Sequence, residues 1–123
     1  MADDSQRAPS KMLPLTSAVL HIMLTLADGE KHGYAIMQEV EANTGGVMRM
    51  GPGTLYGSLQ RMLKDGLIVE ASERVLASDE ERRRYYRLTG FGQQVLSAEA
   101  QRLEQLVRLA QHKQVLPGLG GAS

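Results

Sequence analysis

A short amphipathic helix followed at once by two strand-like segments is the most informative pattern in this sequence. The helix is expected between Gly51-Pro52, which suit a helix start, and Gly66, which suits the left-handed residue after a helix end. Its apolar residues repeat at helical spacing: Leu55, Leu59, Met62 and Leu63. Residues 67–73 and 83–89 then read as two short strands rich in β-branched and aromatic residues. This pattern predicts a helix packed beside a β-hairpin.

Helical spacing also predicts helices over residues 15–27 and 33–43 before this pair, and a long helix from Thr89 to about His112 after it. The expected fold is mainly α with a small β-hairpin. It is a winged helix-turn-helix of three helices and a two-stranded wing, plus a long C-terminal dimerisation helix. The expected organisation is a flexible N-terminal tail (1–12), a DNA-binding domain (13–89), the dimerisation helix (90–113) and a flexible tail (114–123). Residues 74–82 are expected to form a protruding, mobile hairpin tip.

The residue inventory argues against an enzyme. Cysteine is absent, and the three histidines, His21, His32 and His112, lie on different predicted elements without metal-ligand spacing. His32 is expected to cap a helix. The segment 51–57 is rich in glycine but lacks the lysine of a phosphate-binding loop. We therefore expect no catalytic residue, metal or cofactor. Since no apolar run is long enough to span a membrane, a cytoplasmic protein is expected.

The polar face of the helix over residues 52–64 is the candidate binding surface. As the second helix of a helix-turn-helix pair, it would enter the major groove of DNA. Thr54, Tyr56 and Ser58 offer hydroxyl groups, and Arg61 offers a guanidinium, to phosphates or base edges. Three alternatives stay open: Tyr56 packs against the preceding helix, Thr54 closes the first turn through its own backbone, or Arg61 is simply solvated.

Arg82, Arg83 and Arg84 mark the second strand of the wing as a second candidate contact. Strand alternation would send Arg83 to the opposite face from its two neighbours. The acidic residues 79–81 just before them could pair with these arginines, so a modest, salt-dependent affinity is expected. The alternative is a solvated charged loop.

A narrow apolar seam on the long C-terminal helix predicts a homodimer. Its members are Leu96, Leu103, Leu106, Val107 and Ala110. A seam of this kind on an otherwise charged helix is typical of helix–helix contacts between subunits. The alternative is that it packs entirely against the first helix of its own chain.

Three segments resemble the PadR family of bacterial transcriptional regulators: HGYAI at 32–36, GTLYGSLQRMLKDGLI at 53–68 and YYRLTGFG at 85–92. The resemblance covers roughly residues 13–112 and implies a homodimeric repressor that binds a palindromic operator. By position it implies that Gly53, Thr54, Tyr56, Ser58 and Arg61 meet the major groove, with Tyr34 near the DNA backbone. Gly57 departs from the family, in which proline is frequent at this position.

Some members of that family bind planar aromatic compounds at the dimer interface, so a small apolar or aromatic effector is a further expected partner. Met12, Met23 and the last helix are candidates to line a pocket for it. The alternative is that the two methionines belong to the core. The alternative to a DNA-binding regulator is a winged-helix protein-interaction module, an idea motivated by the formal net charge of zero.

Overall fold

The computed structural model describes residues 7–75 and 82–117, and only the backbone of residues 72–75, 82 and 83. In chain order the elements are a 3₁₀ turn η2 (Pro9–Met12), α1 (Ser17–Thr25), β1 (Lys31–His32), α2 (Gly33–Asn43), α3 (Pro52–Lys64), β2 (Ile68–Val75), β3 (Arg82–Leu88) and α4 (Gly90–His112). The predicted order of three helices, a hairpin and a long helix is confirmed.

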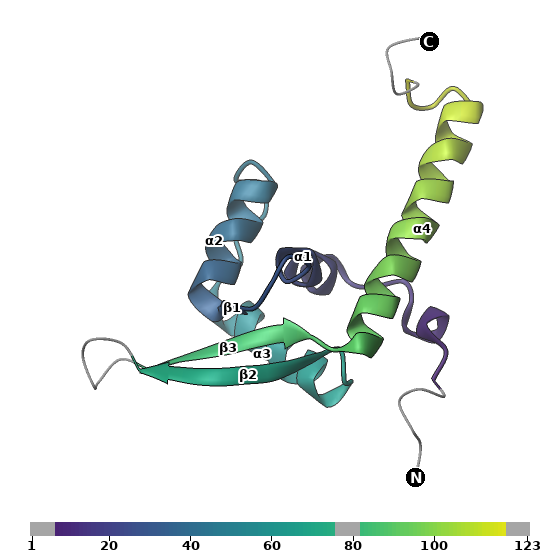
Figure 1. Ribbon diagram of the computed structural model, residues 1–123. Coiled ribbons are helices and arrows are strands. Elements are labelled where there is room, and N and C mark those ends of the chain that lie inside the picture. The colour runs from purple at the N-terminus through teal and green to yellow at the C-terminus, as the bar shows by residue number, and fades with distance from the viewer. Residues whose placement is uncertain (1–6, 76–81, 118–123) are drawn as a thin grey trace.

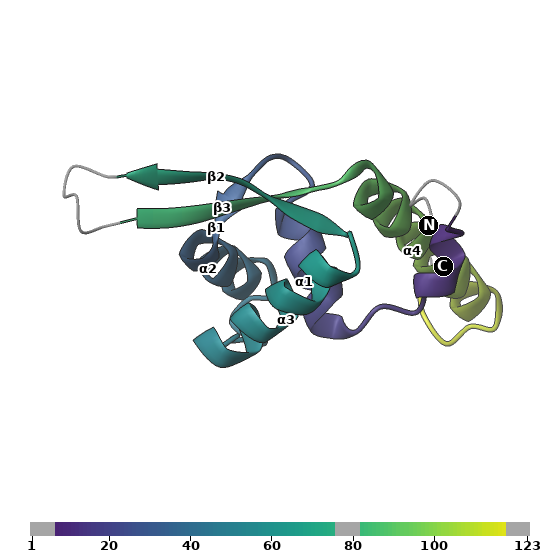
Figure 2. The same ribbon diagram turned by 90° about the horizontal axis from the view of Figure 1, so that it is seen from below.

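Helices α1, α2 and α3 pack together along one face of the hairpin formed by β2 and β3 (Figure 2). The hairpin extends well beyond them, and α4 rises from its other end (Figure 1). The helices and the sheet share one apolar core. Its fully buried members include Ile22, Met23, Ile36, Val40, Leu55, Leu59, Met62 and Val95.

Capping residues and glycines set the helix boundaries. The hydroxyl of Thr16 accepts a hydrogen bond from the Val19 N–H, and His32 Nδ1 accepts one from the Ala35 N–H. The expected capping role of His32 is therefore confirmed. Gly66 follows α3 with a φ of 76°, a left-handed conformation that glycine adopts without strain.

Two predictions need correction, and a third falls mostly outside the described residues. The sheet has three strands in the order β1-β3-β2, because Lys31 and His32 pair antiparallel with Tyr86 and Tyr85. The first helix begins at Ser17 and ends at Thr25, so it is shorter than the predicted 15–27. Most of the predicted hairpin tip, residues 76–81, lies outside the described residues, as do residues 1–6 and 118–123 of the predicted tails.

The N-terminal segment is tied to the domain from Arg7 onward, although residues 1–12 were expected to form a flexible tail. The Arg7 Nη2 donates to the Asp65 carbonyl at 2.8 Å, and the guanidinium lies 4.1 Å from the centre of the Phe91 ring. A cation over an aromatic face is an attractive arrangement. These contacts join the N-terminal segment to the end of α3 and the start of α4.

The start of α4 is locked to the turn after α3. The Thr89 hydroxyl lies 2.6 Å from the Gly66 carbonyl and accepts a hydrogen bond from the Gly92 N–H. The Thr89 N–H donates to the Leu67 carbonyl at 3.0 Å. A single residue therefore connects β3 to α4, and it is fixed on both sides.

A buried carboxylate makes a second joint along α4. Glu99 is 1% exposed; it accepts a hydrogen bond from the Leu15 N–H and forms a two-point ion pair with Arg102. The hydrogen bond from Arg102, more than any other contact, lowers the pKa of Glu99 below its usual value. Glu99 therefore keeps its negative charge at the place where α4 meets the segment leading into α1.

Candidate nucleic-acid interface

The first turn of α3 is built to receive an anion. Gly51 precedes the helix without supplying a side-chain cap, and Pro52 is its first residue. The N–H groups of Gly53 and Thr54 therefore point out of the helix end, where the helix dipole favours negative charge. Both residues are exposed. This end of α3 has the chemistry of a phosphate contact.

Arg61 lies on the exposed side of α3, as its helical spacing predicts. Gln60 and Lys64 are also exposed, and the sequence reasoning did not single them out. Counting from Gly53, Gly57, Gln60 and Lys64 follow at i+4, i+7 and i+11, which is the signal that would have found them. The apolar stripe of Leu55, Leu59 and Met62 occupies the opposite side, in the core.

Ser58 does not belong to this surface. Its side chain is 5% exposed because it lies between the buried Leu55 and Leu59 on the core side of the helix. The sequence prediction that its hydroxyl reaches DNA is therefore corrected. Ser58 is small, polar and at the edge of the apolar stripe, so nothing in the sequence indicated that its side chain is buried.

Tyr56 is 47% exposed, but its hydroxyl group points back into the protein. A β-carbon built on Gly33, the first residue of α2, would lie 2.6 Å from the Tyr56 Oη. The open alternative that Tyr56 packs against the preceding helix is therefore what the structure shows. Part of the ring edge remains on the surface of α3.

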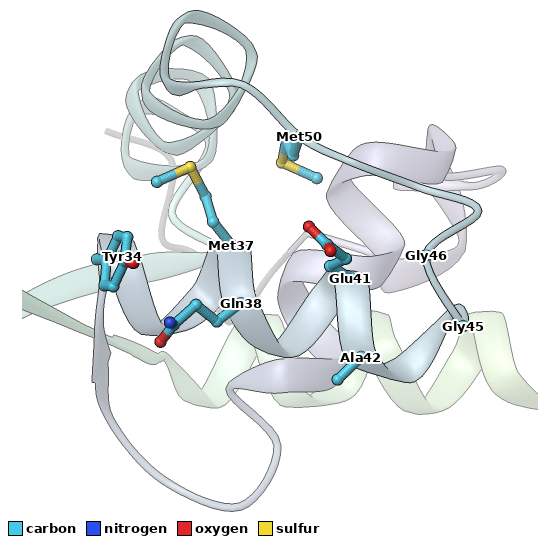
Figure 3. A pocket seen from close by; sticks show the side chains of 8 residues that line it. All are labelled: Tyr34, Met37, Gln38, Glu41, Ala42, Gly45, Gly46 and Met50. Atoms are coloured by element: carbon cyan, nitrogen blue, oxygen red, sulfur yellow. The ribbon is translucent and has the colours of Figure 1, made fainter.

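Tyr34 is exposed on the first turn of α2, where the resemblance places a backbone contact. Two residues earlier in the chain, the His32 ring packs edge-on against Tyr85, with 5.4 Å between the ring centres. Tyr34 also lines an open hollow of about 740 Å³ between α2 and the loop that leads to α3 (Figure 3). Met37, Glu41 and Met50 line the same hollow.

The wing presents one described arginine of the predicted three. Arg84 is exposed on β3, and its Nε lies 3.8 Å from the Glu70 Oε1. Arg82 and Arg83 pair through their backbones with Val75 and Arg74 of β2. Their side chains lie outside the described residues, as does the acidic segment 79–81. Arg87, one residue before the end of β3, is a further exposed cation.

The seam on α4 divides into two parts. Leu96 is buried in the core of the domain, because it lies in the first two turns of α4 beside the buried Phe91 and Val95. Its assignment to a dimer interface is therefore corrected. Farther along, Leu106 and Val107 are exposed, while Leu103 and Ala110 are half-buried. The C-terminal half of α4 stands clear of the rest of the domain (Figure 1).

Two leucines that the prediction did not include are also exposed. Leu109 lies next to Ala110 on α4, and Leu24 lies on α1. In the sequence, Leu109 could have been found from its closeness to the apolar Leu106 and Val107. A strict heptad pattern does not place all three residues in one seam. Within the described residues, no group of three acidic or histidine side chains could hold a metal ion, and no helix is long and apolar enough to cross a membrane.

A small antiparallel sheet with a protruding hairpin, packed on three helices, defines a winged helix-turn-helix protein, and a long helix completes the chain. A family model described as the transcriptional regulator PadR-like family matches residues 19–98. The chain belongs to this family and is a PadR-like transcriptional regulator rather than an enzyme.

Known proteins with similar sequence or structure agree with this membership. The transcriptional regulator Rv3488 of Mycobacterium tuberculosis (strain ATCC 25618 / H37Rv) is 40% identical over 89 residues, which are 72% of this chain and 78% of that protein. A PadR family transcription regulator from hypervirulent Clostridium difficile R20291 has the same fold, with a TM-score of 0.68 and 23% identity. That match covers 80% of this chain and 99% of the other.

A further solved structure is that of Bacillus subtilis PadR in complex with operator DNA. It matches with a TM-score of 0.61 and 22% identity over 69% of this chain and 47% of the other. The chain thus spans about half the length of that relative, and at this identity the likeness concerns the fold alone.

Proposed function

We propose that this PadR-like regulator is a homodimeric repressor that binds a palindromic operator through α3 and the wing. The observation that carries the proposal is the exposed first turn of α3, with Gly53 and Thr54 at an uncapped helix end and Arg61 on the same helix. Tyr34 and Arg84 add exposed groups on α2 and β3. In the B. subtilis relative, the same fold is seen bound to operator DNA. Such a protein acts in the cytoplasm, beside the chromosome.

The test is a fluorescence-anisotropy titration of the protein with the DNA upstream of its own gene. Specific binding is expected, and it should weaken at least tenfold between about 50 and about 200 mM salt because counterions are released from the phosphates. Arg61→Ala should lower the affinity about tenfold. Arg108→Ala is the matched control, because Arg108 is an exposed arginine on α4 that pairs with Glu104.

The alternative is a protein-interaction module. The formal net charge of zero and the pairing of Arg84 with Glu70 are the observations that favour it. A folded protein that binds neither its own upstream DNA nor any sequence selected from a random pool, at either salt concentration, would favour that alternative. Salt-insensitive binding that Arg61→Ala leaves unchanged would also count against the operator proposal.

Dimerisation is proposed to use the exposed part of the α4 seam. Leu106 and Leu109 are each about half exposed, and burial of a leucine side chain stabilises an interface by about 2 kcal/mol. Leu106→Glu combined with Leu109→Glu should therefore raise the dimer dissociation constant at least about 100-fold. Sedimentation velocity would show this as a shift to the monomer. Gln105→Glu, which adds one negative charge at an exposed neighbour, should leave the dimer intact, and an unchanged mass for the double variant would contradict the assignment.

An effector site is proposed at a hollow of about 130 Å³ beneath the N-terminal segment. Met12, Leu15, Val19 and Met62 form most of its apolar wall, and Arg61 lies on its rim. Met23, the other methionine considered from the sequence, is fully buried in the core and does not line it. A cavity of about this size holds a single aromatic ring.

A ligand at this hollow would contact the helix that is proposed to read DNA. One-ring compounds such as phenol and benzoate are expected to release labelled operator at millimolar concentration. Met12→Trp should reduce this response without changing the affinity for DNA. If release by these compounds is the same in Met12→Trp, the effector does not occupy this hollow.

A further inference from the structure

Gly33 and Tyr56 form a contact that accounts for a glycine at the first position of α2. A β-carbon on Gly33 would lie 2.6 Å from the Tyr56 Oη, 3.0 Å from its Cζ and 3.2 Å from its Cε1. These distances are shorter than van der Waals contact, so the ring edge occupies the space of a side chain. The φ of Gly33 is not in the left-handed region. Glycine is therefore needed here for space and not for backbone freedom.

The same contact lies next to the middle strand of the sheet. Gly33 follows β1 directly, and Lys31 of β1 is the register partner of Tyr86 on β3. Burial of Tyr86, followed by the influence of Glu70 and Tyr56, raises the pKa of Tyr86. Tyr56 is therefore a point at which α3 meets the start of α2, next to β1.

We propose that Gly33 is a positioning residue for DNA recognition, because the Gly33–Tyr56 contact sets the orientation of the first turns of α3. This inference rests on the proposed function of α3. It gives the HGY and GTLY segments, which are far apart in the sequence, a single joint role. Tyr56 acts through its packing on α2, and the groups that meet DNA are its neighbours, such as Thr54.

The geometry separates this role from a role in stability. Leu55, Leu59 and Met62 hold the back of α3 in the core, whereas Tyr56 is about half exposed and can swing outward into solvent. A β-carbon at Gly33 would therefore displace the ring without opening the core. The first turn of α3 would lose its lateral support, and hydrogen bonds to DNA depend on donor–acceptor distances within a few tenths of an ångström.

The decisive variant is Gly33→Ala, with Gly90→Ala as its matched control. Each glycine is the first residue of a helix and follows a residue whose side chain caps it, but a β-carbon at Gly90 would meet nothing within 4 Å. Gly33→Ala should lower operator affinity about tenfold while thermal stability changes little. Gly90→Ala should leave operator affinity unchanged and be neutral or slightly stabilising. Tyr56→Ala should also weaken binding, and adding Gly33→Ala to it should cause no further loss.

An NMR measurement without DNA decides the contact itself. Nuclear Overhauser effects between the Gly33 Hα protons and the Tyr56 ring are expected in the wild type. Amide shifts of residues 53–57 should move in Gly33→Ala but not in Gly90→Ala. Absent Overhauser effects, unmoved shifts or additive losses in the double variant would each overturn the proposal. If wild-type protein binds no DNA, the proposed function fails on its own, and the NMR result still decides whether Gly33 positions α3.

Discussion

Gly92→Ala is expected to lower the free energy of unfolding by at least about 3 kcal/mol. A β-carbon at Gly92 would lie 2.0 Å from the carbonyl oxygen of Leu67 and 3.0 Å from its carbonyl carbon. Neither atom can move freely, because the Leu67 carbonyl accepts the Thr89 N–H and the Gly92 N–H is bonded to the Thr89 hydroxyl. The clash therefore falls on backbone that joins α3, β2 and α4. Urea denaturation followed by circular dichroism would measure the loss.

Gly90→Ala serves as the control for this substitution as well. It lies two residues earlier on the same helix, and a β-carbon there meets open space. Since alanine is a better helix former than glycine by up to about 1 kcal/mol, Gly90→Ala should be neutral or slightly stabilising. Equal effects of the two substitutions would show that the Leu67 contact does not determine the cost at Gly92.

Glu99→Ala is expected to lower the free energy of unfolding by about 2 kcal/mol. The Glu99 side chain is fully buried. The substitution removes both the carboxylate that accepts the Leu15 N–H hydrogen bond and the charge that pairs with Arg102. Glu99→Gln should cost less, because an amide oxygen can still accept the Leu15 N–H while the ionic part is lost. Arg102 is partly exposed and remains hydrated in either variant.

The stabilisation by Glu99 should also depend on pH. The folded-state pKa is lowered from an ordinary value of 4.5, so the unfolded chain takes up this proton first as the pH falls. The ionised Glu99 therefore contributes in full above about pH 4.5, and its contribution is lost as the pH falls through the lower, folded-state pKa. Unfolding measured from pH 7 to pH 3 should show this loss in the wild type but not in Glu99→Gln.

Glu104→Gln provides the comparison for an exposed ion pair. Glu104 and Arg108 are four residues apart on α4, whereas Glu99 and Arg102 are three apart, and both side chains of the Glu104 pair are mostly in solvent. Exposed pairs of this kind contribute little to stability. If Glu104→Gln costs as much as Glu99→Gln, burial is not what makes the Glu99 pair important.

Much of the fold could be predicted because its signals are local. Gly51, Pro52 and Gly66 bound α3 as expected, and Thr89 caps α4. The two-residue strand β1 could not be predicted in this way, since two residues carry no period and pair only with a strand more than 50 positions away. The ordered segment after Arg7 was missed for a similar reason: polar composition suggested a tail, and its anchors, Asp65 and Phe91, are distant in the sequence.

The candidate interface was only partly predictable. Helical spacing correctly placed Thr54 and Arg61 on the exposed side of α3, but it misplaced Ser58 at the edge of the buried stripe and Leu96 at the core end of the seam. Helical spacing gives the direction in which a residue points from its own helix. Whether a neighbouring element buries the side chain in that direction depends on tertiary packing. The contact between Gly33 and Tyr56 joins two helices and has no signature in either one alone.

The direct passage from β3 into α4 makes the long helix a mechanical lever. Only Thr89 separates Leu88 from Gly90, and its hydrogen bonds to the Gly66 and Leu67 carbonyls hold the junction between β3 and α4 rigid. The 23 residues of α4 extend about 34 Å at 1.5 Å per residue, so a 10° rotation of α4 about its far end moves its start, and the wing fixed to it, by about 6 Å. In a dimer joined through α4, a small change in how the two helices cross would therefore alter the distance between the two wings.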